Sequence, residues 1–121
     1  MKNNVLIKIL HSFVYAFNGI VYLLKNETNG RVHFFATAVV IAAGIYYRLN
    51  AMEWVAISLC IGMVLAAELL NTAIEKIVDF ISPNYHHKAG TIKDLAAAGV
   101  MVLAIVSIVV AAIIFWPKIV A

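Results

Sequence analysis

The chain has 121 residues, of which 64% are hydrophobic and only 12% carry a charge. Soluble globular domains carry roughly 25% charged residues, so this composition excludes an ordinary soluble domain and indicates one integral membrane domain over residues 1–121. The net charge of +3 is small, and the positions of the basic residues are more informative than their number.

The first predicted element is an amphipathic helix over residues 5–25. Polar residues recur there every three or four positions, as at Lys8, Tyr15 and Lys25, while apolar residues occupy the opposite face. A helix of this kind can lie in the membrane surface, which is the arrangement we expect. The alternative that the pattern leaves open is an ordinary helix packed on a bundle.

Three transmembrane helices are predicted after it, at about 31–48, 51–81 and 92–117. The hydrocarbon core of a bilayer requires about 20 apolar residues. The first range is short and the third is long enough. The second would be roughly 46 Å long at about 1.5 Å per residue, so it should protrude on one side. Ser82-Pro83-Asn84 is expected to end the second helix, and Pro117 is expected to end the third.

The basic residues favour one orientation of these helices. Most of them lie before the first span or around the loop between the second and third: Lys2, Lys8, Lys25, Arg31, Lys76, Lys88 and Lys93. The first loop holds only Arg48, and the tail holds only Lys118. Because Lys and Arg concentrate in cytoplasmic loops, the N-terminus and the second loop are predicted to be cytoplasmic and the C-terminus to lie outside.

An unusual polar face occurs near the cytoplasmic end of the second span. At 100° per residue, one side of the helix within about 100° of arc carries Glu68, Asn71, Thr72, Glu75 and Asp79. A charged group inside a membrane costs at least ~2.5–3.5 kcal/mol, so such residues indicate function. Two carboxylates can bind a divalent cation, and a free one can accept a proton from a hydroxyl. For Asp79, a simple ion pair with a lysine at the wet end of the helix stays open.

Two flanking segments place further polar groups on the same side of the membrane. Glu27 precedes the first span, and the loop after the second supplies Tyr85, His86, Lys93 and Asp94. Lysine binds phosphate as a point charge, and the free N–H groups at the start of the third helix also favour an anion. The chain has no P-loop, kinase glycine-rich loop or nucleophile elbow, so any nucleotide site is unconventional.

The segment "ELLNTAIEKIVD" (68–79) resembles the signature of the prokaryotic diacylglycerol kinase family, which consists of small trimeric membrane lipid kinases. The similarity extends to "SFVYAFNGI" (12–20), the Glu27-x-Asn29-x-x-x-His33 spacing, "KDLAAAGV" (93–100) and "IFWPK" (114–118). The Glu-x-Asn…His pattern and the terminal Pro-Lys are more similar to the undecaprenol kinase branch than to the Gram-negative diacylglycerol kinase branch. Two departures are Gly30, where a bulkier residue is common, and His87-Lys88.

The resemblance implies a role for each candidate residue. Glu68 would be the general base at the lipid hydroxyl, and Glu27 and Glu75 would hold Mg²⁺ and, through it, the phosphates of ATP. Asn71, Asp79 and Lys93 would complete the active site. The remaining nucleotide contacts would be Lys8, Tyr15, Tyr85, His86, Lys93 and Asp94. The implied enzyme is a homotrimer with shared active sites in the bacterial cytoplasmic membrane. Undecaprenol is favoured as its lipid substrate, and diacylglycerol stays open as the alternative.

Two other functions fit the sequence less well than a kinase does. A small proton-coupled transporter would use intramembrane carboxylates and explain Glu68, but it would leave Glu27, Lys93 and Asp94 without a role. A non-catalytic interaction protein would not need to keep every carboxylate of the motif.

Overall fold

The computed structural model describes residues 2–121 and contains four helices. They are α1 (Lys2–Asn26), α2 (Thr28–Tyr46), α3 (Ala51–Ile81) and α4 (His87–Val120). No strand occurs within residues 2–121, so the predicted all-helical fold is confirmed.

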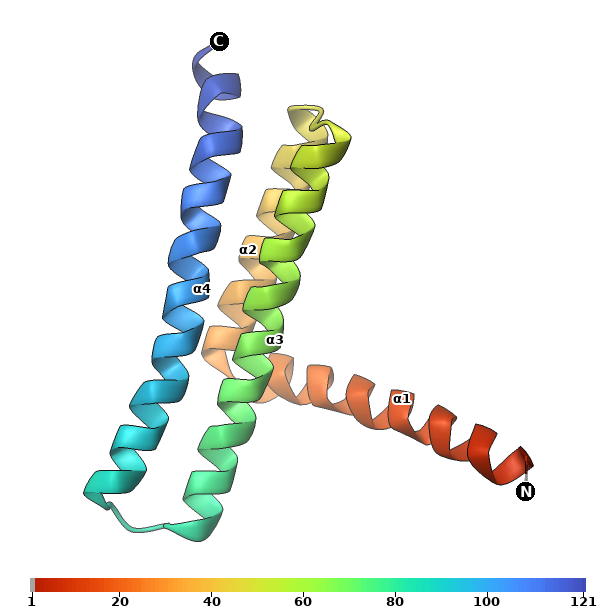
Figure 1. The fold of residues 1–121 in the computed structure, drawn as a ribbon, viewed down its shortest axis with the longest axis vertical. Coiled ribbons are helices and arrows are strands. Elements are labelled where there is room, and N and C mark those ends of the chain that lie inside the picture. Colours follow the sequence, from red (N-terminus) through yellow and green to blue (C-terminus); the bar gives the residue numbers. More distant parts are fainter. Residues whose placement is uncertain (1) are drawn as a thin grey trace.

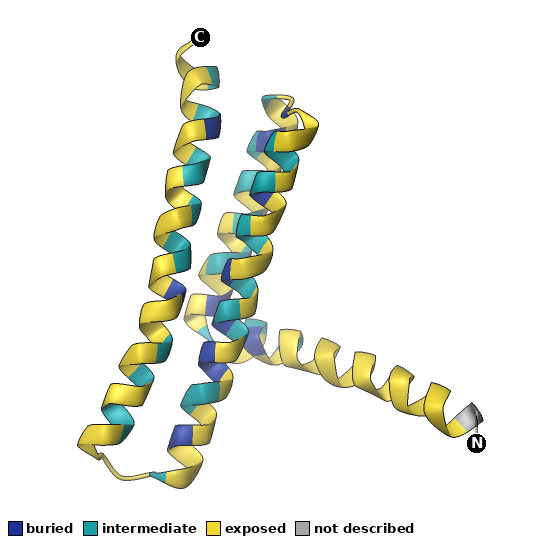
Figure 2. Cartoon of the chain, in the orientation of Figure 1, coloured by how far each residue is buried: buried dark blue, intermediate teal, exposed yellow. Residues whose placement is uncertain are grey.

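The helices α2, α3 and α4 run side by side, whereas α1 leaves them at a steep angle (Figure 1). Most of α1 is exposed, and it packs against α2 and α3 only near its C-terminal end (Figure 2). Leu23, which is 1% exposed, is the main buried residue of this junction. Gly30 on α2 lies directly against it, because a Cβ atom there would be 2.5 Å from Leu23 Cγ. The close approach explains why a small residue occupies position 30.

Three helices are long and apolar enough to cross a membrane: residues 4–26 of α1, α3 and α4. They indicate a multi-pass membrane protein. The set differs from the one expected from the sequence, because it contains α1 and omits α2. The helix α2 has only 19 residues, and its first turns hold Asn29, Arg31 and His33, which lower its mean hydropathy.

Helices α1 and α2 each begin three residues earlier than expected, at Lys2 and Thr28, and α4 extends beyond both of its expected ends. The helix α4 begins at His87 and not near residue 92, because His86 caps it: the His86 Nδ1 atom accepts a hydrogen bond from the Lys88 N–H at 3.1 Å. Pro117 does not close the helix, which continues to Val120. Proline removes one backbone hydrogen bond and displaces the carbonyl four residues earlier. This far along α4 the loss affects only the last turn.

The apolar core lies at the end of the bundle away from α1. It is formed by Leu49, Ile57 and Ile114, with Trp54 and Phe115 packed against it. At the same end, Asn50 and Glu53 form a reciprocal capping box at the start of α3. Glu53 Oε1 also lies 3.2 Å from Lys118 Nζ on α4. The apolar core therefore lies at one end of the bundle, and the buried polar residues of α3 lie toward the other end.

Candidate active site

The centre of the candidate site is a group of buried polar side chains on α3. Glu68 is 3% exposed, and Asn71 and Thr72 are each 6% exposed. The packing of α2 and the end of α1 against α3 removes this face from solvent. Glu68 meets His33 of α2, whose Nε2 atom lies 3.5 Å from Glu68 Oε2. Burial of a carboxylate is costly unless donors or cations compensate for the lost water, so this placement is typical of a functional group.

Asn71 connects this centre to the next turn of α3. Its amide Nδ2 donates a hydrogen bond to Glu75 Oε1 at 3.3 Å. Within the described residues, Asn71 Oδ1 and Thr72 Oγ1 are buried without a hydrogen-bond partner. An unsatisfied buried polar atom costs about 1–3 kcal/mol. These two atoms therefore mark where the single chain lacks a partner.

Glu27 lies at the junction of α1 and α2 and faces α3. It occupies the N-cap position of α2, but its side chain makes no capping hydrogen bond. Its Oε1 atom instead lies 3.5 Å from Lys76 Nζ, which also sits 5.6 Å from the centre of the Tyr22 ring. The carboxylate is thus held beside the polar face of α3 by an ion pair that is half exposed.

Asp79 and Lys93 form an ion pair between α3 and α4 at the end of the bundle. Asp79 is eleven residues beyond Glu68, which corresponds to about 16 Å along the helix. The expectation that Lys93-Asp94 stands at the start of a helix is wrong. Because α4 begins at His87, its free N–H groups belong to the first turn, and Lys93 lies beyond them.

Four further candidate residues are exposed and remote from Glu68 in the single chain. Lys8 and Tyr15 lie on the part of α1 that extends away from the other helices. Tyr85, in the α3–α4 connection, is 89% exposed, and Asp94 on α4 is exposed as well. The single chain therefore gathers Glu27, Glu68, Asn71 and Glu75 around one face of α3, but it does not bring Lys8 and Tyr15 to them.

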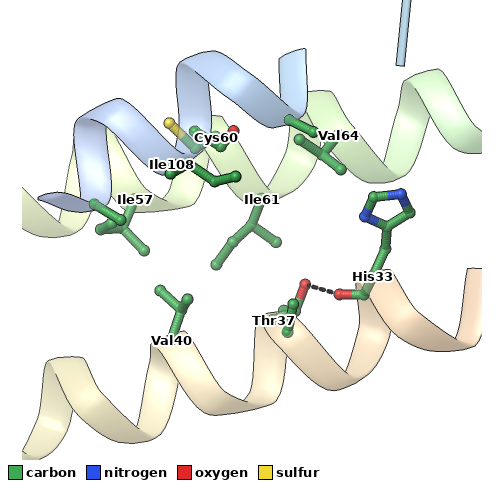
Figure 3. A pocket seen from close by; sticks show the side chains of 12 residues that line it. His33, Thr37, Val40, Ile57, Cys60, Ile61, Val64 and Ile108 are labelled. Atoms are coloured by element: carbon green, nitrogen blue, oxygen red, sulfur yellow. Dashed lines mark hydrogen bonds between the residues drawn. The ribbon is translucent and has the colours of Figure 1, made fainter. Parts of the chain in front are cut away.

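An apolar cavity of about 240 Å³ lies between α2, α3 and α4, and its lining includes His33, the residue whose Nε2 atom is 3.5 Å from Glu68 Oε2. His33 forms one end of it, and the walls come from α2, α3 and α4 (Figure 3). The hydroxyl of Thr37 is already used, since it donates to the His33 carbonyl at 2.8 Å. Apart from His33, Thr37, Cys60 and Ser107, the lining is aliphatic: Ala36, Val40, Ile57, Ile61, Val64, Ala104, Ile108 and Ala111. Hydrocarbon is the chemistry that fits this space.

The oxygen atoms of this site are the kind of ligand that a hard cation such as Mg²⁺ binds, with substrate oxygens completing its coordination. Within residues 2–121 no group of three or more His, Cys, Asp or Glu side chains converges on one point. Mg²⁺ in enzymes commonly uses one or two carboxylates together with substrate phosphates and water. Glu27 and Glu75 are two carboxylates of this kind, and Asn71, which donates to Glu75, carries an unpartnered oxygen. These are the residues that could hold Mg²⁺.

Comparison with known proteins assigns this arrangement to a family. Residues 14–115 match the profile described as Prokaryotic diacylglycerol kinase. The chain belongs to the prokaryotic diacylglycerol kinase family. The resemblance inferred from residues 68–79 is therefore confirmed, and the chain is a phosphotransferase with an alcohol acceptor.

Relatives within the prokaryotic diacylglycerol kinase family carry two different names. An undecaprenol kinase of Bacillus subtilis is 40% identical over 115 residues, which cover 95% of this chain and 94% of that protein. A diacylglycerol kinase of Synechocystis is 36% identical over 110 residues, which cover 90% of this chain and 63% of that protein. The diacylglycerol kinase of Escherichia coli is 28% identical over 109 residues, with coverage of 90% and 89%.

The sequence patterns indicate no role for His33 or Thr72. His33 was visible only as part of a spacing pattern after Glu27. Its approach to Glu68 depends on how α2 packs on α3, which no spacing within one helix reveals. Thr72 did show a signal, because it lies 40° from Glu68 on the polar face at 100° per residue.

Proposed function

We propose that the protein is an ATP- and Mg²⁺-dependent lipid kinase that phosphorylates the hydroxyl of a membrane lipid alcohol at the cytoplasmic face of the bacterial inner membrane. The observation that carries this proposal is the burial of the Glu68 carboxylate next to His33, which lines an apolar cavity. A hydrocarbon chain in the cavity would bring its terminal hydroxyl next to a base. Glu27 and Glu75, nearer the nucleotide, lie close enough for their charges to act on Glu68.

The transfer needs positioning and charge neutralisation more than covalent help from the protein. Glu68 accepts the proton of the lipid hydroxyl as its oxygen bonds to the γ-phosphorus of ATP. The bond from that phosphorus to the β,γ-bridging oxygen breaks, and ADP leaves with the electron pair. Mg²⁺, held by Glu27 and Glu75 when bound, would neutralise charge on the phosphates. Asn71 orients Glu75 through its amide, while Lys93 and Asp79 contact the nucleotide.

The arrangement of the helices supports one placement in the membrane. We assign α2, α3 and α4 to the bilayer and α1 to its cytoplasmic surface. Its steep angle to the other helices supports this placement (Figure 1). The 19 residues of α2 span about 28 Å, close to the ~30 Å hydrocarbon core. The abundance of Lys and Arg near the N-terminus and the α3–α4 loop supports a cytoplasmic site and an external C-terminus.

A homotrimer with shared active sites would supply what the single chain lacks. Four candidate residues are exposed in the single chain and are free to contact a nucleotide or a neighbouring subunit: Lys8, Tyr15, Tyr85 and His86. The unpartnered Asn71 Oδ1 and Thr72 Oγ1 support the same view, because buried polar atoms in finished sites are nearly always paired.

Two observations favour undecaprenol over diacylglycerol as the lipid. The relative named undecaprenol kinase is 40% identical and matches nearly the full length of both chains. The mainly aliphatic cavity also suits an alcohol whose chain is hydrocarbon from the first carbon onward. A diacylglycerol places two ester groups close to its hydroxyl, and each ester oxygen buried without a donor costs about 1–3 kcal/mol.

The test is phosphoryl transfer from labelled ATP to lipid in reconstituted vesicles. Wild-type protein should phosphorylate undecaprenol in the presence of Mg²⁺, and Glu68→Gln should lower kcat by about 10²–10⁴-fold, the usual contribution of a general base. Glu53→Gln is the matched control, because it makes the same change at the opposite end of α3 and should keep full activity. A fully active Glu68→Gln variant would overturn the mechanism. ATP-independent, proton-driven solute flux would instead support a transporter.

A further inference from the structure

His33 lies next to Glu68 but has no role in the reaction proposed above. Its imidazole reaches from α2 to Glu68 on α3, with Nε2 3.5 Å from Oε2. The Glu68 side chain is 4% exposed and that of His33 is 21% exposed. In the described part of the chain, no other side chain forms a hydrogen bond or ion pair with Glu68. Among the described residues, His33 is thus the polar side chain that pairs with the buried carboxylate.

The surroundings of Glu68 create a need for such a partner. Glu27 and Glu75 lie near enough to repel its charge. A buried carboxylate beside two others requires a donor or cation to remain a usable base. A neutral imidazole with its proton on Nε2 is a donor, and it can bind one carboxylate oxygen while leaving the second free. Catalytic hydrogen bonds are commonly long before substrate binds and shorten in the substrate complex, so a separation of 3.5 Å is compatible with such a bond.

His33 also forms one end of the apolar cavity (Figure 3). We infer that His33 is a positioning residue: it binds Oε2 of Glu68 and turns Oε1 toward the end of the cavity, where the lipid hydroxyl arrives. This inference rests on the proposed lipid kinase activity. The backbone carbonyl of His33 accepts the Thr37 hydroxyl, which ties residue 33 to the next turn of α2.

A pair of substitutions at residue 33 separates this role from simple packing. His33→Phe keeps a ring of similar size but removes the donor, whereas His33→Gln replaces Nε2 with an amide nitrogen that can donate. We expect His33→Phe to lower kcat by about 100-fold, the loss typical of a misplaced catalytic group, with an unchanged KM for ATP. His33→Gln should recover at least about a tenth of wild-type kcat. Val39→Phe is the control, because it places the same ring on an exposed part of α2 outside the cavity, and it should keep normal kcat.

Two further measurements keep the inference falsifiable if His33→Phe folds poorly. The double variant His33→Phe/Glu68→Gln should be no slower than Glu68→Gln alone, since groups acting as a unit are strongly non-additive. In wild-type protein with ¹⁵N-labelled histidine, His33 should show the Nε2–H tautomer, and Glu68→Gln should shift its Nε2 resonance. Equal losses in His33→Phe and His33→Gln, additive effects in the double variant, or an unmoved resonance would each overturn the inference. An active Glu68→Gln variant would instead overturn the proposed function.

Discussion

Filling the apolar cavity should weaken the use of the lipid without changing the use of ATP. Ala104 lines the cavity from α4 and is half-buried. Leucine at this position adds three carbons to a space of about 240 Å³ and displaces a similar length of substrate chain. Each buried methylene contributes about 0.8 kcal/mol, so the loss is about 2.4 kcal/mol. At about 1.4 kcal/mol per factor of ten, kcat/KM for the lipid should fall roughly 50-fold.

The assay measures initial rates of phosphoryl transfer from labelled ATP in mixed micelles while the mole fraction of the lipid alcohol varies. Ala104→Leu should raise KM for the lipid and leave KM for ATP unchanged. Ala112→Leu is the control, because it makes the same change on an exposed face of α4 outside the cavity. Thermal unfolding of both variants excludes a loss caused by overpacking, which costs typically 1–3 kcal/mol.

The reasoning would be refuted if a well-folded Ala104→Leu variant kept wild-type kcat/KM for the lipid. Equal losses in Ala104→Leu and Ala112→Leu would also refute it, because the effect would then reflect bulk added to α4 and not occupation of the cavity.

Two other variants test opposite ends of the bundle. Lys76→Met removes the cation paired with Glu27. In a titration of activity, the Mg²⁺ concentration at half-saturation should therefore fall by up to about fivefold, the limit for a pair this exposed. A higher Mg²⁺ requirement would contradict the assignment of Glu27. Asn50→Ala breaks the capping box with Glu53 and should lower the stability by about 1 kcal/mol, measured as a lower Tm, while kcat stays unchanged. A large loss of kcat would show that the N-terminal end of α3 affects the site.

The features that depend on residues close together in the sequence could be predicted from it. The 100° spacing placed Glu68, Asn71 and Thr72 on one face of α3, and all three are buried. Helix periodicity and hydropathy gave the all-helical class, and the motif at 68–79 gave the family. These features depend on neighbours within a single helix, and local patterns report them directly.

The features that were missed are of two kinds: the ends of α4, and contacts between elements. His86 caps α4 through its own side chain, a local event that the apolar run beginning near residue 95 conceals. The meeting of His33 and Glu68 requires the register of α2 against α3. Whether Lys8 and Tyr15 reach the site depends on the direction of α1 and on neighbouring subunits. Interior prolines mark helix ends poorly when, as at Pro117, only one turn remains.

The helices α2 and α4 differ from the other neighbouring pairs in how they are joined. Throughout residues 2–121, no Cα atom of α2 comes within 8 Å of one in α4. Near the core they are linked by side chains: the ring of Tyr47, which follows the last residue of α2, lies 6.1 Å from the Phe115 ring of α4. A hydrocarbon chain can therefore slide between them from the bilayer without separating any closely packed helices. The dwell time of a phosphorylated lipid would then be governed by the length of chain held between α2 and α4, and turnover would need no rearrangement of the fold.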